Sequence, residues 1–178
     1  DFTARIQETE NITVYGNVGN VSIDVNWGSS AKDIAASITS RLSETGVSAT
    51  AHTRLNISFE EEPNGTQTTD TVSFNVYGKN TAAVLISANV DFGETNGRGA
   101  DLTDLAAAIN GTTGKTGIAA SLSIDKSTLT MISNDGYDIA TEDYRLVAVQ
   151  GPAMLVAGAN EDNTNVTGTN TANVIFDA

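Results

Sequence analysis

The sequence predicts an α+β fold made of two related small antiparallel sheets, each carrying one helix, strand-rich and with long loops. Three observations lead to this prediction: apolar and polar residues alternate along several segments, two segments have the spacing of amphipathic helices, and the same order of segments occurs twice. Hydrophobic residues make up 39% of the 178 residues and aromatic residues only 6%. The core must therefore be assembled mainly from Val, Ile, Leu and Ala.

An internal duplication orders these segments. Each copy reads Val-Tyr-Gly, an alternating strand, a helix candidate, a Thr-Gly turn and a second strand. The first copy comprises Val14–Gly16, Val21–Trp27, Ser30 to about Glu44, Thr45–Val47 and Leu55–Phe59. The second comprises Val76–Gly78, Val84–Val90, Asp101–Asn110, Thr116–Ile118 and Leu129–Ser133. Asp33 and Asp104 are 71 positions apart, as are Gly46 and Gly117, and this constant offset argues against chance similarity.

The two helix candidates share a start signal. Ser30 stands three residues before Asp33, and Asp101 stands three residues before Asp104. This spacing suits the unpaired amides and the positive end of a helix start. Apolar residues at helical spacing define one buried face in each: Ile34, Ile38 and Leu42 in the first, and Leu102, Leu105 and Ile109 in the second. Four alanines, Ala35, Ala36, Ala106 and Ala107, allow close approach to a sheet.

Strands and turns complete the pattern. Val72, Phe74 and Val76 alternate with polar residues, so this strand is expected to have one buried and one solvated face. Turn signals occur at Asn64-Gly65 and Asp135-Gly136, and Glu60–Pro63 marks a break between the copies. The polar stretch Glu161–Ala172 is expected to be a loop. Val174 and Phe176 then alternate again and are expected to form a closing strand beside the N-terminal one.

These signals divide the chain into three parts. We predict a first β-β-α-β unit at residues 1–70 and a second, related unit at residues 71–145. Residues 146–178 are expected to supply C-terminal strands and a loop that return toward the N-terminal unit.

Charge and cysteine content exclude several classes of partner. The formal net charge is -13, and the few basic residues are spread along the chain. Neither nucleic acid nor an anionic membrane is therefore expected as a partner, because both need clustered Lys and Arg. The chain has no cysteine, which rules out disulfides, thiolate metal sites and thiol nucleophiles. It also begins without Met, which suggests an excised fragment, expected to be monomeric.

No catalytic, cofactor-binding or metal-binding residue is predicted. His52 is the only histidine and has no Gly-x-Ser-x-Gly elbow nearby, so it is interpreted as a surface strand residue. The acidic segments Glu60–Glu62 and Glu161–Asn165 lack the ligand spacing of a calcium loop and are interpreted as solvated loops.

Two further features have simple structural interpretations. Gly16–Gly19 and Gly97–Gly99 are too short for a phosphate cradle and are interpreted as turns. Trp27 ends an alternating strand on its apolar phase, which favours a core or subdomain-interface position over ligand stacking.

The order of motifs resembles that of a known family. In the second copy, the run Ala100–Asn110, followed by Thr116–Ser121, Leu129–Ser133 and Asp135–Ile139, closely resembles the flagellin IN motif. This motif occurs in the variable middle of bacterial flagellins and in flagellar cap and hook-associated proteins. Asp33–Ile38 and Thr45–Ala49 resemble a more diverged copy. The resemblance covers roughly residues 12–59 and 72–140.

The resemblance implies the central, outward-facing variable region of a flagellin. Such a region is a non-catalytic structural component of the flagellar filament, extracellular, exported through the flagellar apparatus and without cofactors. Neighbouring flagellin subunits are the implied partners, with host receptors or antibodies as further candidates. O-glycosylation near Thr66–Thr71 or Thr164–Thr171 is also implied. The alternatives are a domain of a cap or hook-associated protein, and a bacterial adhesin-type binding module.

Overall fold

The computed structural model describes residues 9–59, 69–92, 100–147, 154–159, 165–166 and 171–177, with side-chain environments up to residue 157. The fold is α+β and strand-rich, with short helices and several small antiparallel sheets, as the sequence predicts. Among the described residues, no helix is long and apolar enough to span a membrane.

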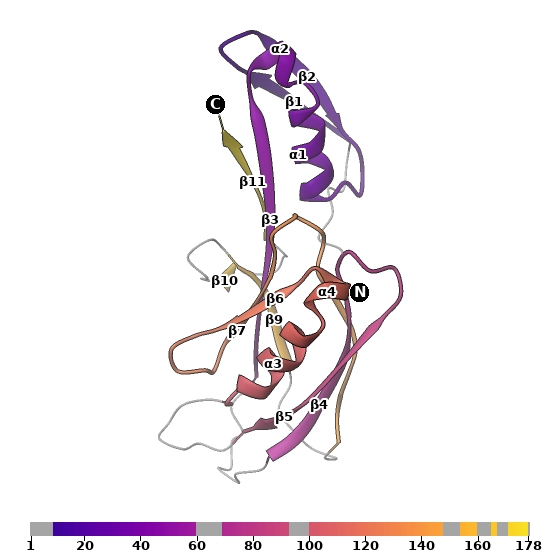
Figure 1. Cartoon of the computed structure of the whole chain (residues 1–178), viewed down its shortest axis with the longest axis vertical. Coiled ribbons are helices and arrows are strands. Elements are labelled where there is room, and N and C mark those ends of the chain that lie inside the picture. The colour runs from indigo at the N-terminus through magenta and orange to yellow at the C-terminus, as the bar shows by residue number, and fades with distance from the viewer. Residues whose placement is uncertain are drawn as a thin grey trace.

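The first part of the chain forms a hairpin, two helices and a long strand. Strands β1 (Glu10–Tyr15) and β2 (Asn20–Val25) pair antiparallel. Helix α1 (Ala31–Thr39) and the single turn α2 (Leu42–Thr45) follow, and β3 (Ser48–Phe59) then runs for twelve residues. In Figure 1, α1 lies between this hairpin and β3, and β3 extends along the long axis of the molecule.

The second part of the chain repeats this order and adds two strands, β7 and β8. Its elements are β4 (Thr69–Tyr77), β5 (Val84–Asp91), α3 (Thr103–Gly111), α4 (Thr113–Thr116), β6 (Ala119–Leu122), β7 (Leu129–Ser133) and β8 (Ala140–Leu146). β4 pairs with β5 on one edge and with β8 on the other. Helix α3 packs against β5 and β6.

β3 joins the two parts. Its first half, from Ser48 to Arg54, pairs with β11 (Thr171–Asp177). Its second half pairs with β7 on one edge and β9 (Met154–Ala159) on the other, and β9 pairs in turn with β10 (Asn165–Val166). We call β1, β2, α1, α2 and the first half of β3 the first unit. The second unit consists of the second half of β3 together with β4–β8, α3 and α4.

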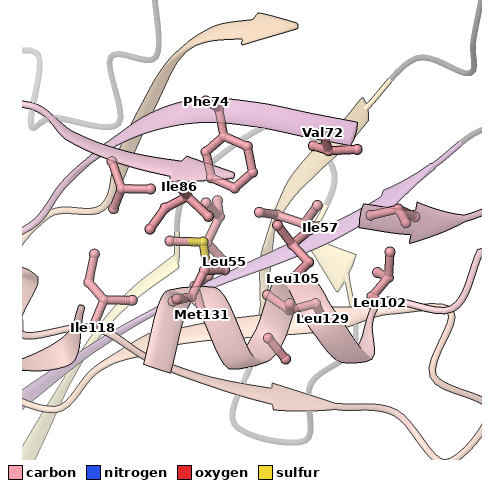
Figure 2. Packing of buried hydrophobic residues seen from close by; sticks show 14 of the residues in the cluster. Leu55, Ile57, Val72, Phe74, Ile86, Leu102, Leu105, Ile118, Leu129 and Met131 are labelled. Atoms are coloured by element: carbon pink, nitrogen blue, oxygen red, sulfur yellow. The ribbon is translucent and has the colours of Figure 1, made fainter. Parts of the chain in front are cut away.

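Each unit has its own buried cluster. The large cluster lies in the second unit, between the β4–β5 strands and α3, with Leu55 and Ile57 of β3 contributing to it. Figure 2 shows Phe74 and Val72 of β4 on one side of this cluster and Leu105 of α3 on the other. The smaller cluster, in the first unit, consists of Val14, Ile23, Ile38 and Val47. A third cluster of buried residues, Ala31, Ala35 and Ala51, comes from α1 and the first half of β3.

Several residues occupy the positions that their spacing predicts. Val72, Phe74 and Val76 are fully buried, while Ser73 and Asn75 between them are half-buried. Leu102, Leu105 and Ile109 are also fully buried. Of the four alanines expected at helix–sheet contacts, Ala35 and Ala106 are buried, whereas Ala36 and Ala107 are exposed.

The first helix differs from the prediction. It ends at Thr39, and a break at Ser40 and Arg41 precedes α2. The break rotates the apolar face, so Leu42 is 47% exposed instead of buried. Ile34 is only partly buried, and Ala31 takes a buried place on this helix instead.

The two helix starts also differ, contrary to the prediction. Ser30 forms the expected capping box: its hydroxyl accepts from the Asp33 amide, and the Asp33 carboxylate accepts from the Ser30 amide. The N-cap residue of α3 is Leu102, without a side-chain cap. Asp101 instead accepts from the amide of Thr103, two residues on.

Pairing corrects three further predictions. Leu55–Phe59 and Leu129–Ser133 do not occupy equivalent places in the two copies, because the first continues β3 without a break whereas the second is a separate strand after β6, and the two pair with each other. The C-terminal strand β11 lies beside β3 and not beside the N-terminal strand. Within the predicted loop 161–172, β10 and the start of β11 form strands. The predicted break at 60–63 and the turn at Asn64-Gly65 lie outside the described residues.

A matched pair of leucines tests the position of the core. Leu105→Ala should lower the free energy of unfolding by about 2–5 kcal/mol, because the leucine is fully buried and its truncation leaves a cavity. Leu42→Ala should change it by no more than about 0.5 kcal/mol, because that side chain is exposed. Urea unfolding of both variants checks this, and equal losses would contradict the described packing.

Candidate functional site

The best-defined local geometry of the first unit surrounds Thr45 and Gly46. The buried Thr45 hydroxyl donates to the Arg41 carbonyl oxygen at 3.1 Å and accepts from the Val47 amide at 3.1 Å. Gly46 has a φ of 78°, a left-handed conformation that glycine adopts without strain, and its amide closes α2 on Leu42. This Thr-Gly junction ends the helix and turns the chain into β3.

The β1–β2 hairpin is clamped onto this junction. The carbonyl oxygen of Thr45 accepts from the Val18 amide at 3.2 Å. A Cβ atom on Gly16 would lie 1.9 Å from that same oxygen, so only glycine allows the hairpin to approach this closely. The Val-Tyr-Gly and Thr-Gly signals of the sequence are therefore in direct contact, which their separation along the chain did not reveal.

The second unit contains the same contacts. The buried Thr116 hydroxyl donates to the Thr112 carbonyl at 3.2 Å and accepts from the Ile118 amide at 3.2 Å. Gly117 has a φ of 71°. The Thr116 carbonyl accepts from the Lys79 amide at 2.8 Å, and a Cβ on Gly78 would lie 2.3 Å from that oxygen.

A further pair of contacts fixes the helices to the strands that follow. Thr39 of α1 uses its hydroxyl both to donate to the Ala49 carbonyl and to accept from the Ala49 amide. Asn110 of α3 makes the same two bonds to Ala120 with its amide group. Each residue of one pair is 71 positions from its counterpart, so the sequence offset holds for these contacts as well.

The residues considered for chemistry do not converge. His52 lies on β3, where it is half-buried. Gly16 to Gly19 form a turn closed by the Gly16 amide on the Gly19 carbonyl, as predicted. Trp27 is 64% exposed, because β2 ends at Val25 and the residue belongs to the following turn, so the predicted core position is wrong. The runs at 60–62, 97–99 and 161–164 lie outside the described residues.

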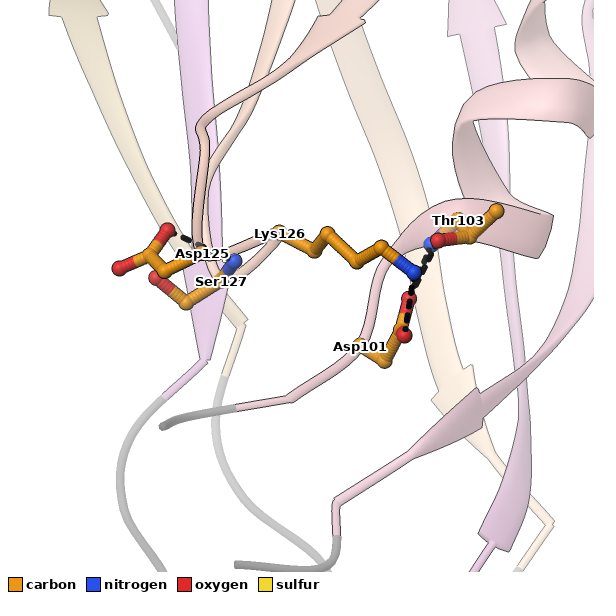
Figure 3. Close-up of polar contacts among 5 residues, drawn as sticks. All are labelled: Asp101, Thr103, Asp125, Lys126 and Ser127. Atoms are coloured by element: carbon orange, nitrogen blue, oxygen red, sulfur yellow. Dashed lines mark hydrogen bonds and ion pairs between the residues drawn. The ribbon is translucent and has the colours of Figure 1, made fainter. Parts of the chain in front are cut away.

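A polar pocket of about 320 Å³ lies beside the start of α3. In Figure 3, Lys126 reaches from the β6–β7 turn toward Asp101, and its ammonium group lies 3.1 Å from the carboxylate. The Asp101 carboxylate also accepts from the amide and the hydroxyl of Thr103. The lining residues are Thr69, Asn89, Asp91, Asp101, Thr103, Asp104 and Lys126.

The electrostatics of this pocket favour the charged form of one of its carboxylates. The Thr103 hydroxyl, with further help from Lys126, holds the pKa of Asp101 below its usual value. A carboxylate with a lowered pKa is a weak general base at neutral pH, and its hydrogen bonds hold the chain at the start of α3. Elsewhere, burial raises the pKa of Tyr144 to about 12, so its phenol is not activated either. Within the described ranges, no three His, Asp or Glu side chains are grouped to hold a metal ion.

One comparison with known proteins bears on this geometry. Residues 11–58 match the model of the flagellin hook IN motif. The match runs from the second residue of β1 to the last but one residue of β3 and includes the Gly16 contact and the Thr45-Gly46 junction. It supports a flagellin-related protein. Flagellin-family proteins are structural and non-enzymatic, and they assemble with other flagellin subunits into an extracellular filament.

The extent of the match differs from the expected resemblance. It covers the copy that was expected to be the more diverged, and it does not include residues 72–140. A search of the curated proteins gave no match.

The buried threonines should be essential to the junctions. Thr45→Val and Thr116→Val should each cost about 1–3 kcal/mol of unfolding free energy, because the following amide loses its buried acceptor. Thr13→Val, at an exposed position on β1, is the control and should stay within about 0.5 kcal/mol. Similar small effects for all three variants would show that these hydroxyls do not hold the junctions.

Acid should weaken the contacts at the start of α3. Because the folded-state pKa of Asp101 lies below its ordinary value of 3.8, its carboxylate stabilises the fold above that pH, and the contribution is lost as the pH falls toward the folded-state pKa. Asp101→Asn should therefore flatten the stability profile below pH 3.8. Asp104→Asn, with the same change of charge in the same pocket, is the control. Thermal unfolding against pH measures both, and identical profiles would contradict this role of Asp101.

Proposed function

We propose that this chain is the surface-exposed, variable outer region of a bacterial flagellin, a non-catalytic structural part of the flagellar filament. The match of residues 11–58 to the flagellin hook IN motif carries this proposal. The matched segment comprises all but the first residue of the first hairpin, both first-unit helices and all but the last residue of β3.

Residues 72–140 are proposed as a second copy of the motif. Support comes from contacts that recur in detail: the threonine hydroxyl bonds, the left-handed glycine, the hairpin glycine against the threonine carbonyl, and the bond pair from helix to strand. A left-handed glycine and a buried threonine are each common, but four matching contacts at corresponding positions indicate one inherited design.

The proposed division of the sequence places a first β-β-α-β segment at residues 1–70, a second, related segment at 71–145 and the C-terminal strands at 146–178. Unlike the two units defined above, it assigns all of β3 to the first segment. β4 begins at Thr69 and β8 ends at Leu146, each within two residues of these boundaries.

The proposed mechanism is mechanical and colloidal. A net charge of -13 gives neighbouring outer regions a mutual repulsion, which keeps a densely decorated filament surface soluble. Exposed polar residues, such as Asn11, Ser22 and Asp24 on the outer face of the first hairpin, bond to one another across the strands. The surface is then available for antigenic display. Neighbouring flagellin subunits are the proposed partners within the filament, and antibodies or host receptors are proposed to bind the exposed surface. The proposed location is the extracellular flagellum, reached through the flagellar export apparatus.

A hook-associated protein is the second candidate. The matched motif is described by reference to the hook. The motif that the sequence resembles also occurs in hook-associated and cap proteins. These proteins occupy the hook–filament junction or the filament tip, whereas a flagellin occurs along the whole filament.

Antibody labelling separates these candidates. Gold-labelled antibodies raised against this chain should decorate filaments of the source cells along their entire length, because every subunit would present the region outward. Cells that lack filaments are the control for specificity. Gold confined to the tip or to the hook junction would favour the second candidate, and an absence of gold from intact filaments would contradict both.

A further inference from the structure

The first unit has a much smaller core of its own than the second. Among the described residues, its buried clusters contain four Val and Ile side chains and three alanines, and the cluster of the second unit contains seventeen side chains. A core of four Val and Ile side chains with three alanines is a small source of stability for an independent unit. Other contacts must therefore stabilise the first unit.

The first of these contacts is at its sheet edge. In the second unit, β6 receives its antiparallel neighbour from β7, the next strand along the chain. The corresponding segment of the first unit, Ser48 onward, has no such hairpin, because β3 continues straight into the second unit. Its neighbour is β11, from the other end of the chain, which pairs with β3 from Ser48 to Arg54.

The second contact is at the start of α1. A helix start leaves amides without partners, and the Ser30 capping box satisfies only part of them. The amide of Lys32 donates to the carbonyl of Gly136, at 3.1 Å, and Gly136 belongs to the turn after β7. In the second unit, the amide of the N-cap residue Leu102 donates to the carbonyl of Lys126, which lies in that unit's own β6–β7 turn.

The fit of Gly136 is specific. Its φ is 71°, and a Cβ atom there would lie 2.4 Å from the Cβ of Ala51 and 3.0 Å from the amide nitrogen of Lys32. Next to it, the ring of Tyr137 lies under the Lys32 ammonium group, 4.1 Å from the ring centroid. Lys32 thus contacts the second unit through both its backbone and its side chain.

We propose that the first unit is a dependent module, which folds only on an already folded second unit. The second unit supplies the turn that closes α1, and β11 supplies the missing strand. The dependence runs in one direction, because the second unit contains its own closing turn, its own β6–β7 hairpin and the large core.

Substitutions at two matched glycines test whether the first unit depends on the second and not the reverse. Gly46 and Gly117 occupy the same position in the two Thr-Gly junctions, with φ values of 78° and 71°. Alanine at either position strains the backbone. It should speed hydrogen exchange by about 5- to 30-fold at those amides whose protection depends on the junction. Hydrogen exchange with mass spectrometry on the whole chain reports β1, β2 and α1 separately from β4, β5 and α3.

The expected result is asymmetric. Gly46→Ala should speed exchange in both units, because the opening of the first unit that it favours precedes the unfolding of the second unit. Gly117→Ala should speed exchange in the second unit alone, because the first unit opens while the second stays folded. Unchanged exchange in the second unit of Gly46→Ala would overturn the proposal, since the units would then be independent. Faster exchange in the first unit of Gly117→Ala would overturn it as well, since the two units would then open together.

A measurement on the unaltered chain covers the case in which a variant fails to fold. With increasing urea below the unfolding midpoint, first-unit amides should exchange through a partial opening while second-unit amides remain protected. Gly136→Ala, placed in the second unit, should enlarge that first-unit opening. Exchange of all amides through one common opening would refute the proposal.

Discussion

The backbone pairing of β3 is the constraint on which the rest of the structure depends. Three strands from distant parts of the chain hydrogen-bond to its twelve residues. A slip of one residue would move every side chain of β3 to the opposite face of the sheet. Leu55 and Ile57 would then leave the large core, and Ala51 would leave the contact with Gly136. Both units therefore require the same register.

A buried polar pair helps to set that register. Asn56 of β3 lies directly opposite Thr130 of β7, and the threonine hydroxyl donates to the Asn56 side-chain oxygen at 2.7 Å. Both residues are almost fully buried, so a shifted register would break the hydrogen bond between them and leave two polar side chains in the interior. Apolar packing tolerates small slips of position, whereas this pair favours a single alignment.

Local patterns in the sequence predicted what local physics controls. The alternation around Phe74 and the spacing of Leu102, Leu105 and Ile109 identified buried faces correctly, because each reflects the period of its own element. The predicted core position of Trp27 was wrong because the alternation of apolar and polar residues continues one step past the end of β2 into a turn. The predicted burial of Leu42 was wrong because the helix breaks at Ser40, and no glycine or proline in the sequence indicates this break.

Long-range pairing was the part that the sequence could not predict. Leu55–Phe59 and Leu129–Ser133 are both apolar strands that follow a Thr-Gly turn, so they read as copies, yet in the fold they are partners. Similar composition is expected in either case, because strands that share a core face the same environment. The contact between the Val-Tyr-Gly and Thr-Gly signals was hidden for the same reason, since spacing along the chain carries no information on distance in space.

The continuity of β3 also limits how such a molecule can be recombined. In tandem repeat proteins, each repeat is a structural unit that contacts only its neighbours, so it can be exchanged as a cassette. Here, a cassette that ended at Phe59 would carry Leu55 and Ile57 away from the large core and remove the strand between β7 and β9. A cassette that ended earlier would cut β3 itself. The two units are therefore expected to be inherited together, with sequence variation concentrated in the connections between strands.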